Sequence, residues 1–225
     1  VIAKLTPNVD DIAVIGKAAL AGGAAGLCAI NTTGPGYTES HGHPILSNGL
    51  GGMSGKGVLP VTLKALAALR AVTDLPLIGC GGLSSAADCR AVAHCGATIF
   101  GIGSGLTGLD TQALGHYFTD LAHDMNQQTD RAAEQVRFDL DMSFNPYQVT
   151  DNKPVCDDIS VVTLDGSLDI RAGEYVFVWI PGVGEKPFSC LTANPVRLAV
   201  INVGPFTDAC YQVSPGETIY LRGPH

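Results

Sequence analysis

Two short apolar runs of the sequence end on glycine residues, and these strand ends could bind an anion. The runs are PLIGCGGLSS at 76–85 and TIFGIGSG at 98–105. Glycine has no Cβ, so a ligand can approach the backbone N–H groups of such a turn closely. Turns of this kind commonly hold phosphate groups. Gly81, Gly82 and Gly103 therefore predict a phosphate cradle shared by two neighbouring strand ends.

Polar side chains end two further apolar runs. Lys4 closes VIAKL, and Asn31 and Thr32 close GLCAINT. A lysine in an apolar strand either points into a polar pocket or extends its ammonium group to the surrounding water. An asparagine amide both donates and accepts hydrogen bonds, which suits a planar, amide-bearing ligand. Asparagine and threonine are also common turn residues, so the residues alone leave both roles open.

A long glycine-rich segment follows the second of these runs. Its cluster Gly51–Gly55 predicts a loop that contacts a ligand, since loops of this length in compact domains are usually functional. His41 and His43 flank a glycine and could bind a metal, but without a Cys or carboxylate cluster beside them we expect no metal site. Cys28 and Cys80 could be reactive thiols, although buried structural cysteine is the more common role.

The first 128 residues alternate strand-like and helix-like segments, which is typical of a parallel sheet covered by helices. A doubly wound sheet and a (β/α)8 barrel both fit this alternation. A phosphate site made by the last two βα turns is a recurrent barrel feature, so the glycines favour the C-terminal half of a TIM (β/α)8 barrel. Tyr117 and Phe118 are expected on the apolar side of the last helix. We predict strands at 1–7, 26–32, 76–82 and 97–103, helices at 10–24, 60–73, 86–96 and 110–125, and a loop at 33–59.

The composition changes after residue 128. Residues 129–145 are polar with broken periodicity and predict a linker. From 146 to 225, short apolar runs alternate with turns that contain Gly and Pro, which indicates an antiparallel β-barrel or sandwich. The expected strands are DISVVTL, EYVFVWI, FSCLT, RLAVINV and TIYLRG. Because the chain opens and closes in mid-pattern, we expect it to be a segment of a longer polypeptide.

Composition argues against several classes of protein. The 225 residues carry a net charge of −8, whereas a face that binds nucleic acid is basic. The sequence shows neither an apolar run long enough to span a membrane nor a secretory signal. The seven cysteines form no C-x-x-C pair, so we expect neither zinc nor an iron–sulfur cluster on this chain. Reduced, unpaired cysteines indicate a cytoplasmic protein.

Five motifs of the first half resemble, in order and spacing, the C-terminal half of the soluble class 1 dihydroorotate dehydrogenases. They are AKLTPNVDDI, AINTTGPG, PILSNGLGGMSG, PLIGCGG and FGIGS, within residues 1–125. The resemblance implies an FMN-binding (β/α)8 barrel that oxidises dihydroorotate to orotate in pyrimidine biosynthesis. Asn31 and Thr32 would bind the orotate. The residues implied to contact FMN are Lys4, Ile30, Gly55, Gly81, Gly82, Gly103 and Ser104.

The tail resembles the electron-transfer subunit of the NAD-linked class 1B enzymes. AGEYVFVWIPGVGEKPFS and VSPGETIYLRGPH carry this resemblance, which covers about residues 146–225. It implies a ferredoxin-reductase-like, FAD-binding β-barrel, so that two usually separate subunits are fused with the catalytic part first. Lysine replaces the arginine of the family's Arg-x-x-Ser flavin motif, which exchanges a bidentate fork for a point charge. The residues implied to contact FAD are Lys186, Pro187, Phe188, Ser189, Gly204 and Thr207.

The resemblance also implies a reaction. A base takes the C5 proton of dihydroorotate while hydride leaves C6 for FMN, and electrons pass through a 2Fe–2S cluster and FAD to NAD. The base, the cluster and the NAD site are expected outside these 225 residues, so we assign no catalytic residue and expect the segment alone to be inactive. A homo- or hetero-oligomer is expected, without nucleic-acid or membrane partners.

Two other interpretations stay open on the sequence. Dihydropyrimidine dehydrogenase, which reduces pyrimidines, shares KLTPN, an Asn-Thr strand end and a GG-x-SG loop, although its FAD region lies upstream of its barrel and differs from this tail. A degenerate barrel that kept phosphate affinity but lost its chemistry would be a binding module. The two alternatives differ from the main interpretation in the reaction and in the flavins that the protein would hold.

Overall fold

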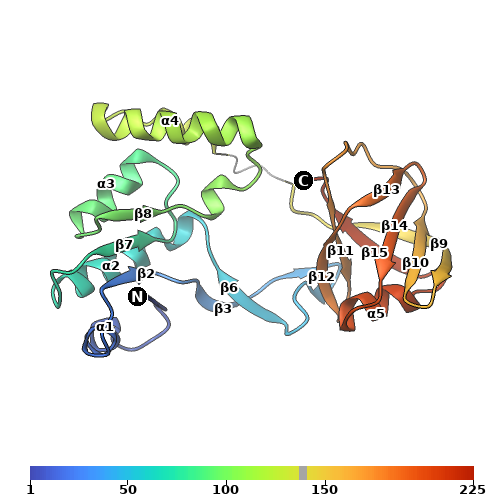
Figure 1. Ribbon diagram of the computed structural model, residues 1–225, viewed down its shortest axis with the longest axis horizontal. Helices are drawn as coiled ribbons and strands as arrows, with labels where there is room; N and C mark the ends of the chain where they lie inside the picture. The colour runs from blue at the N-terminus through green and yellow to red at the C-terminus, as the bar shows by residue number, and fades with distance from the viewer. Residues whose placement is uncertain (137–140) are drawn as a thin grey trace. The chain divides into compact units, whose positions relative to one another are not determined.

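The computed structural model describes residues 1–136 and 141–225, and the chain divides into two compact units (Figure 1). Unit 1 comprises Val1–Gly36 and the described part of Gly52–Leu140. Unit 2 comprises Tyr37–Gly51 together with Asp141–His225. The sequence placed 37–51 with the first half of the chain, but the contacts of this segment are with the second.

Unit 1 is built on a parallel sheet whose strands follow one another in sequence order. The order is β1-β2-β7-β8, and each neighbouring pair runs parallel. All four predicted strands are present, shorter at their ends than the apolar runs suggest. They are β1 (Ile2–Leu5), β2 (Gly26–Ala29), β7 (Leu77–Cys80) and β8 (Ile99–Gly101).

Three of the four predicted helices of unit 1 follow a residue whose side chain caps them, and α2 (Leu59–Arg70) has no such cap. Asp11 accepts the Ala13 N–H at 2.8 Å, and Ser85 accepts the Asp88 N–H at 3.2 Å, so each supplies an acceptor to a helical first turn. Asp110 does the same for Ala113 at 2.8 Å.

Within the described residues, no helix is both long and apolar enough to cross a membrane. The helices are α1 (Ile12–Ala21), α2 (Leu59–Arg70), α3 (Ala86–His94) and α4 (Thr111–Gln127).

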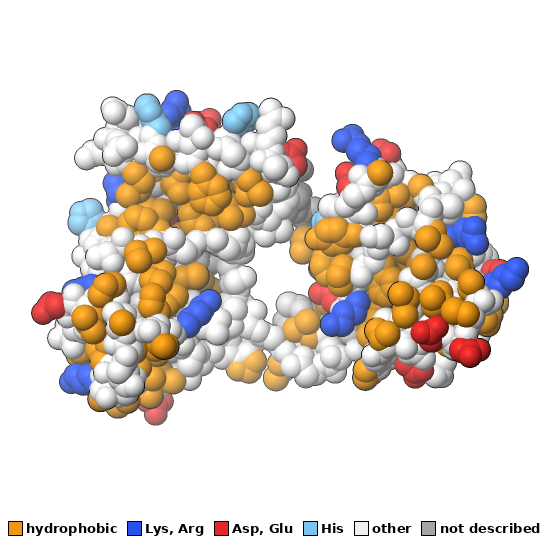
Figure 2. Space-filling model, in the orientation of Figure 1, with side chains coloured by type: hydrophobic (Ala, Val, Ile, Leu, Met, Phe, Trp, Pro, Cys, Tyr) orange, Lys and Arg blue, Asp and Glu red, His pale blue; other side chains and the backbone are white. Residues whose placement is uncertain are grey.

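The two faces of the parallel sheet differ in burial. Side chains alternate across a strand, and Leu27 and Leu77 point into a core covered by the helices, where both are fully buried. On the opposite face, the register aligns Lys4 with Cys28 on β2, and Ile78 with Ile99 on β8. Ile99 is 48% exposed there. This face therefore carries apolar side chains without a covering layer among the described residues, and Figure 2 shows apolar groups at the surface of unit 1.

Residues 33–59, predicted as a loop, contain regular structure instead. Strand β3 (Thr33–Tyr37) pairs with β6 (Leu50–Met53), and β4 (Glu39–Ser40) pairs antiparallel with β5 (His43–Pro44). The 3-10 helix η1 (Lys56–Val58) then leads into α2. The sequence pattern did not predict these strands, because glycine has low strand propensity and supplies no side chain for an alternating pattern.

The segment after α4 packs against that helix. The predicted linker 129–145 contains the 3-10 helix η3 (Arg131–Gln135), and Ala132 is fully buried beside Tyr117. Asp124 on α4 accepts the Ala132 N–H at 2.8 Å, which fixes η3 to the helix. Phe118 was expected on the apolar side, but it is 49% exposed. It follows Tyr117 directly, and adjacent helical residues face different directions.

Unit 2 is a seven-stranded antiparallel sheet with one helix. The sheet order is β12-β11-β15-β9-β10-β14-β13. The sequence predicted an antiparallel β-domain but missed β9 and β12, and missed helix α5 (Pro205–Gln212), which packs Phe206 and Cys210 into the core. The strands are β9 (Asn145–Cys156), β10 (Ile159–Leu164), β11 (Val176–Ile180), β12 (Gly184–Phe188), β13 (Cys190–Ala193), β14 (Val196–Ile201) and β15 (Thr218–Arg222).

The chain connects the two edges of this sheet directly. Strands β12 and β13 lie at opposite edges of the sheet, yet only Ser189 separates them in sequence. A single residue cannot span an open seven-stranded sheet, whose neighbouring strands lie about 4.8 Å apart, so the sheet must curl to bring its edges together. Its inner face holds a buried aliphatic core that includes Val162, Val178 and Leu198.

The outer face of the sheet in unit 2 carries an aromatic cluster around the single tryptophan of the chain. Trp179 on β11 is fully buried, with its ring centroid 5.2 Å from that of Phe144 and 4.8 Å from that of Tyr220. Arg222 lies over the Phe144 ring at 4.8 Å and pairs with Glu185 at 3.0 Å. Phe144, which precedes β9, therefore covers Trp179 from outside the barrel.

Replacing Phe144 with alanine is expected to expose Trp179 and destabilise unit 2. Loss of a fully buried phenyl ring typically costs about 3–5 kcal/mol of the free energy of unfolding. The Trp179 emission should move to longer wavelength, and the unfolding midpoint measured by the same fluorescence should fall. The control is Phe118→Ala, which removes an identical ring from a half-exposed site. Equal effects from the two substitutions would contradict the role given to Phe144.

Candidate functional site

The carboxyl ends of the four parallel strands surround a cavity of about 150 Å³, called here the glycine cavity. Parallel strands in one sheet place their carboxyl ends at the same edge, which is where ligands bind in such sheets. Residues on or directly after β1, β2, β7 and β8 all contribute. The lining residues are Lys4, Ile30, Asn31, Thr32, Met53, Ser54, Val58, Cys80, Gly81, Gly82, Gly103 and Ser104.

Backbone amide groups dominate one side of the glycine cavity. Within the described residues, the N–H groups of Gly81, Gly82, Gly103 and Ser104 donate no hydrogen bond to the protein. Gly82 is buried and Gly81 is half-buried, whereas Gly103 and Ser104 are exposed. Buried N–H groups are nearly always paired, so the free N–H groups of Gly81 and Gly82 indicate an external acceptor. Converging N–H groups of this type bind anions.

The turn after β7 has a shape that only glycine adopts readily. Gly82 has a φ of +80°, and a Cβ added to it would lie 2.6 Å from the Leu59 nitrogen. The buried hydroxyl of Thr62 on α2 donates to the Gly81 carbonyl at 2.8 Å. That bond ties the turn to α2.

The turn after β2 presents two polar side chains to the glycine cavity. Asn31 Oδ1 accepts the Thr32 N–H at 3.0 Å, so its amide nitrogen is left for another partner. Asn8 clamps this turn, because its amide donates to the Thr32 carbonyl at 3.2 Å and accepts the Gly34 N–H at 3.1 Å. Gly52 approaches so closely that a Cβ there would lie 2.0 Å from Thr32 Oγ1.

Lys4 and the Cys80 thiol line the glycine cavity, and the Cys28 thiol lies beside Lys4 on β2. Lys4 is paired in register with Cys28, and no hydrogen bond or ion pair occupies its ammonium group among the described residues. Burial raises the pKa of the Cys28 thiol, nearby Cys80 raises it further, and Lys4 opposes the shift. Cys28 is therefore a protonated thiol at neutral pH, which argues against a nucleophilic role.

The structure groups most, but not all, of the residues predicted for the first half. Gly55 does not line the glycine cavity, although its neighbour Ser54 does. His41 and His43 lie on the β4–β5 hairpin of unit 2, where the His41 Nε2–H donates to the Phe144 carbonyl at 2.7 Å. Among the described residues, no group of three His, Cys, Asp or Glu could hold a metal ion.

Three residues at or near the glycine cavity were not predicted. Val58 in η1 lines it, while Asn8 and Thr62 support its turns. Met53 and Ser54 also line it, and they fall within the predicted ligand-contacting cluster Gly51–Gly55. The motif KLTPN contains Asn8, so a polar residue after the first strand was a usable signal. Thr62 carries no such signal, because it lies in the middle of an ordinary helical pattern.

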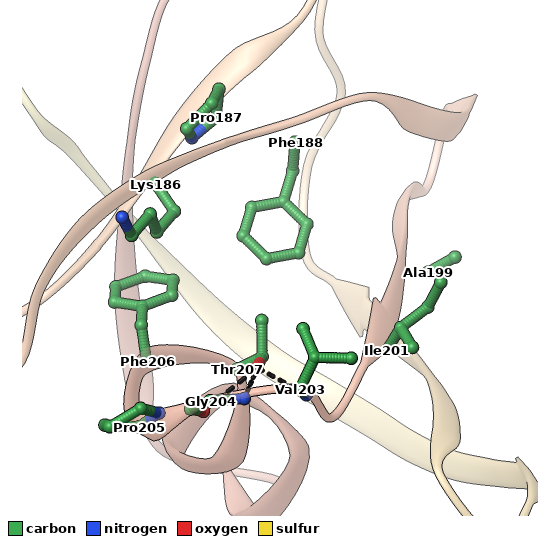
Figure 3. Close-up of a pocket in the computed structure, with 10 residues that line it drawn as sticks. All are labelled: Lys186, Pro187, Phe188, Ala199, Ile201, Val203, Gly204, Pro205, Phe206 and Thr207. Atoms are coloured by element: carbon green, nitrogen blue, oxygen red, sulfur yellow. Dashed lines mark hydrogen bonds between the residues drawn. The ribbon is translucent and has the colours of Figure 1, made fainter.

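Unit 2 contains a larger cavity of about 590 Å³, called here the β-domain cavity. Figure 3 shows side chains from β12, β14 and the start of α5 around it. The Phe188 and Phe206 ring centroids are 6.2 Å apart. The Thr207 hydroxyl accepts the Val203 and Gly204 N–H groups, both at 3.0 Å, and so fixes the turn before α5.

The β-domain cavity gathers five of the six tail residues predicted from the sequence. Lys186, Pro187, Phe188, Gly204 and Thr207 all line it. Ser189 does not, since it follows the end of β12 and lines a separate cavity of about 300 Å³ with Arg171 and Thr192. The bend between β12 and β13 separates it from the others.

Comparison with known protein families assigns the first half of the chain to one of them. The family model described as "Dihydroorotate dehydrogenase" matches residues 1–125. The chain belongs to the dihydroorotate dehydrogenase family. The matched residues contain every residue that lines the glycine cavity.

Curated dihydroorotate dehydrogenases match the same part of the chain under two names. The "Dihydroorotate dehydrogenase B (NAD(+)), catalytic subunit" of Streptococcus pneumoniae is 46% identical over 105 residues, which are 46% of this chain and 34% of that protein. The protein of the same name from Pyrococcus horikoshii is 47% identical over 105 residues, 46% and 35% respectively. The "Dihydroorotate dehydrogenase A (fumarate)" of Lactiplantibacillus plantarum is 45% identical over 112 residues, 49% and 37%. The chain thus spans about a third of the length of these relatives.

A solved structure resembles part of the chain weakly. The cytochrome b5 reductase domain of Ulva prolifera nitrate reductase gives a TM-score of 0.33 at 12% identity. It covers 37% of this chain and 41% of that one. At this TM-score the likeness carries no weight for the function of unit 2.

Gly82→Ala is expected to destabilise unit 1. A left-handed φ at a non-glycine residue costs about 1–3 kcal/mol, and the close approach to Leu59 adds to it. The measurement is the midpoint of thermal unfolding. The control is Gly57→Ala, because a Cβ there meets no atom within 4 Å. A Gly82→Ala midpoint equal to that of the control would contradict the strain assigned to this turn.

Proposed function

We propose that this chain is the FMN- and substrate-binding half of a dihydroorotate dehydrogenase barrel, fused to an FAD-binding domain of the NAD-linked type. One observation carries the proposal. The glycine cavity unites, from four separate strand ends, eight of the nine residues that the sequence assigns to FMN and orotate. These residues are far apart in sequence, so their convergence is a property of the fold.

Three features of unit 1 support a half barrel. The strands lie in sequence order, whereas a doubly wound sheet reverses direction at a switch point. No layer of the described residues covers the face that carries Lys4 and Ile99, and in a closed barrel that face is the packed interior. The glycine cavity, at about 150 Å³, is also smaller than a complete ligand pocket, as expected if further strands complete it.

The residues present fit the phosphate end of FMN. The free N–H groups of Gly81, Gly82, Gly103 and Ser104 would bind the phosphate oxygens, which are strong acceptors. Lys4 would place a positive charge beside the flavin ring, and Ile30, which is 2% exposed, would form an apolar wall. When bound, FMN supplies the acceptor for the hydride.

Asn31 and Thr32 would hold the pyrimidine. The free amide nitrogen of Asn31 would donate to a ring carbonyl of dihydroorotate, while its Oδ1 keeps the turn in place. The substrate would lose a proton from C5 and a hydride from C6. The base for the C5 proton is expected outside this chain, and Cys28 does not fit that role because its pKa is raised by burial. The isolated 225-residue chain is therefore expected to form no orotate.

The β-domain cavity fits FAD, the second flavin of this proposal. Its volume of about 590 Å³ lies in the range of ligand pockets, and the apolar walls formed with Phe188 and Phe206 suit an aromatic ring system. Lys186 would contribute a charge for a phosphate group. FAD bound there would supply an acceptor for electrons that are passed on to NAD. A cavity that fits FAD therefore favours the NAD-linked over the fumarate-linked class.

The flavin content of the full-length protein tests the proposal. Flavins released with acid and separated should contain FMN and FAD in equal amounts. FMN without FAD would overturn the assignment of the β-domain cavity and the NAD-linked class. Absence of both would overturn the enzyme assignment in favour of a binding module. Uracil reduction in place of dihydroorotate oxidation would favour the dihydropyrimidine dehydrogenase interpretation.

Asn31→Asp in the full-length protein is expected to raise the KM for dihydroorotate. Aspartate keeps the oxygen that accepts the Thr32 N–H but loses the amide donor, and one lost hydrogen bond corresponds to about a tenfold effect. Steady-state kinetics with an artificial electron acceptor measure the change. The control is Asn126→Asp, whose amide contacts only its own helix at Ala122. An unchanged KM in Asn31→Asp would contradict the substrate role.

A further inference from the structure

A charged pair outside the glycine cavity joins two of its walls. Lys56 Nζ lies 2.5 Å from both carboxylate oxygens of Asp88. Lys56 stands between Ser54 and Val58, which both line the cavity, and Asp88 is in the first turn of α3. The pair therefore ties the segment before α2 to the helix that follows the Gly81-Gly82 turn.

Asp88 is a fixed negative charge close to the amide groups of that turn. Its side chain is 7% exposed, and Oδ2 accepts the Ser84 N–H at 3.0 Å, only two residues after Gly82. Burial would raise the pKa of Asp88, but hydrogen bonds from Lys56 and Ser84 together hold it below its ordinary value. Asp88 is thus ionised at neutral pH, and its charge has the same sign as a phosphate.

The arrangement poses an electrostatic problem for an anion site. A helix N-terminus and free N–H groups attract a phosphate, whereas a carboxylate in the same first turn repels it. Like charges in a partly desolvated site interact more strongly than in water. Lys56 is the cation that contacts this carboxylate within the described residues.

We propose that Lys56 is a positioning residue for the flavin phosphate, which neutralises Asp88 and holds the Ser54–Val58 wall against the cradle. This inference rests on the proposed binding of FMN to the glycine cavity. Lys56 itself is bound to Asp88 and acts on the ligand through that carboxylate. Lys56 should therefore change the affinity for the phosphate group and leave the affinity for the flavin ring unchanged.

The test compares FMN with riboflavin, which lacks the phosphate, on the deflavinated full-length protein. Lys56→Gln is expected to weaken FMN binding by roughly tenfold, the effect of one uncompensated charge beside a bound anion, with little change for riboflavin. Lys56→Arg should retain the affinity of the wild type. The dissociation constants are measured by quenching of flavin fluorescence on binding.

A double substitution separates charge from folding. Lys56→Gln with Asp88→Asn removes both charges and should recover most of the FMN affinity lost in the single variant. Lys64→Gln, on the exposed side of α2, is the control for loss of a surface lysine. An unchanged FMN-to-riboflavin preference in Lys56→Gln, or no recovery in the double variant, would overturn the inference. Failure of the wild-type protein to bind FMN would instead overturn the proposed function on which the inference rests.

Discussion

The parallel pairing of β1, β2, β7 and β8 is the constraint on which the rest of unit 1 depends. Parallel strands end at one edge, so residues separated by up to a hundred positions in sequence meet there. The register is set by burial, because a shift by one residue would turn Leu27 and Leu77 out of the helix-covered core. Hydrophobic packing on one face thus determines where polar groups appear at the strand ends.

The cavities of the two units are lined by different kinds of groups. Unit 1 uses backbone N–H groups and short polar side chains, in turns made possible by glycine. Unit 2 uses two phenyl rings and a turn fixed by Thr207, around a cavity between β12, β14 and α5. The first arrangement suits an anionic group, and the second suits an apolar ring.

Local sequence patterns predicted the four parallel strands, the four α-helices and the glycine turns of unit 1, because each depends on neighbouring residues. The same patterns missed β9, whose prolines at 146 and 154 and many polar residues obscure its alternation. They missed α5, which has only eight residues and begins at Pro205. The pairing of Lys56 with Asp88 spans 32 positions, and no local pattern in the sequence connects two residues at that separation.

The placement of Tyr37–Gly51 in unit 2 has a consequence for the order of synthesis. His41 binds the Phe144 carbonyl and stacks 4.8 Å from the Tyr220 ring centroid, so its partners are translated about a hundred residues or more after it. The β4–β5 hairpin leaves the ribosome long before the surface that it packs on exists. Neither unit can be excised as one uninterrupted stretch of the gene, and a break at residue 140 would leave unit 2 without part of its structure. All of unit 1 is translated by residue 140, whereas residues 37–51 must wait for the C-terminal part of the chain before unit 2 is complete.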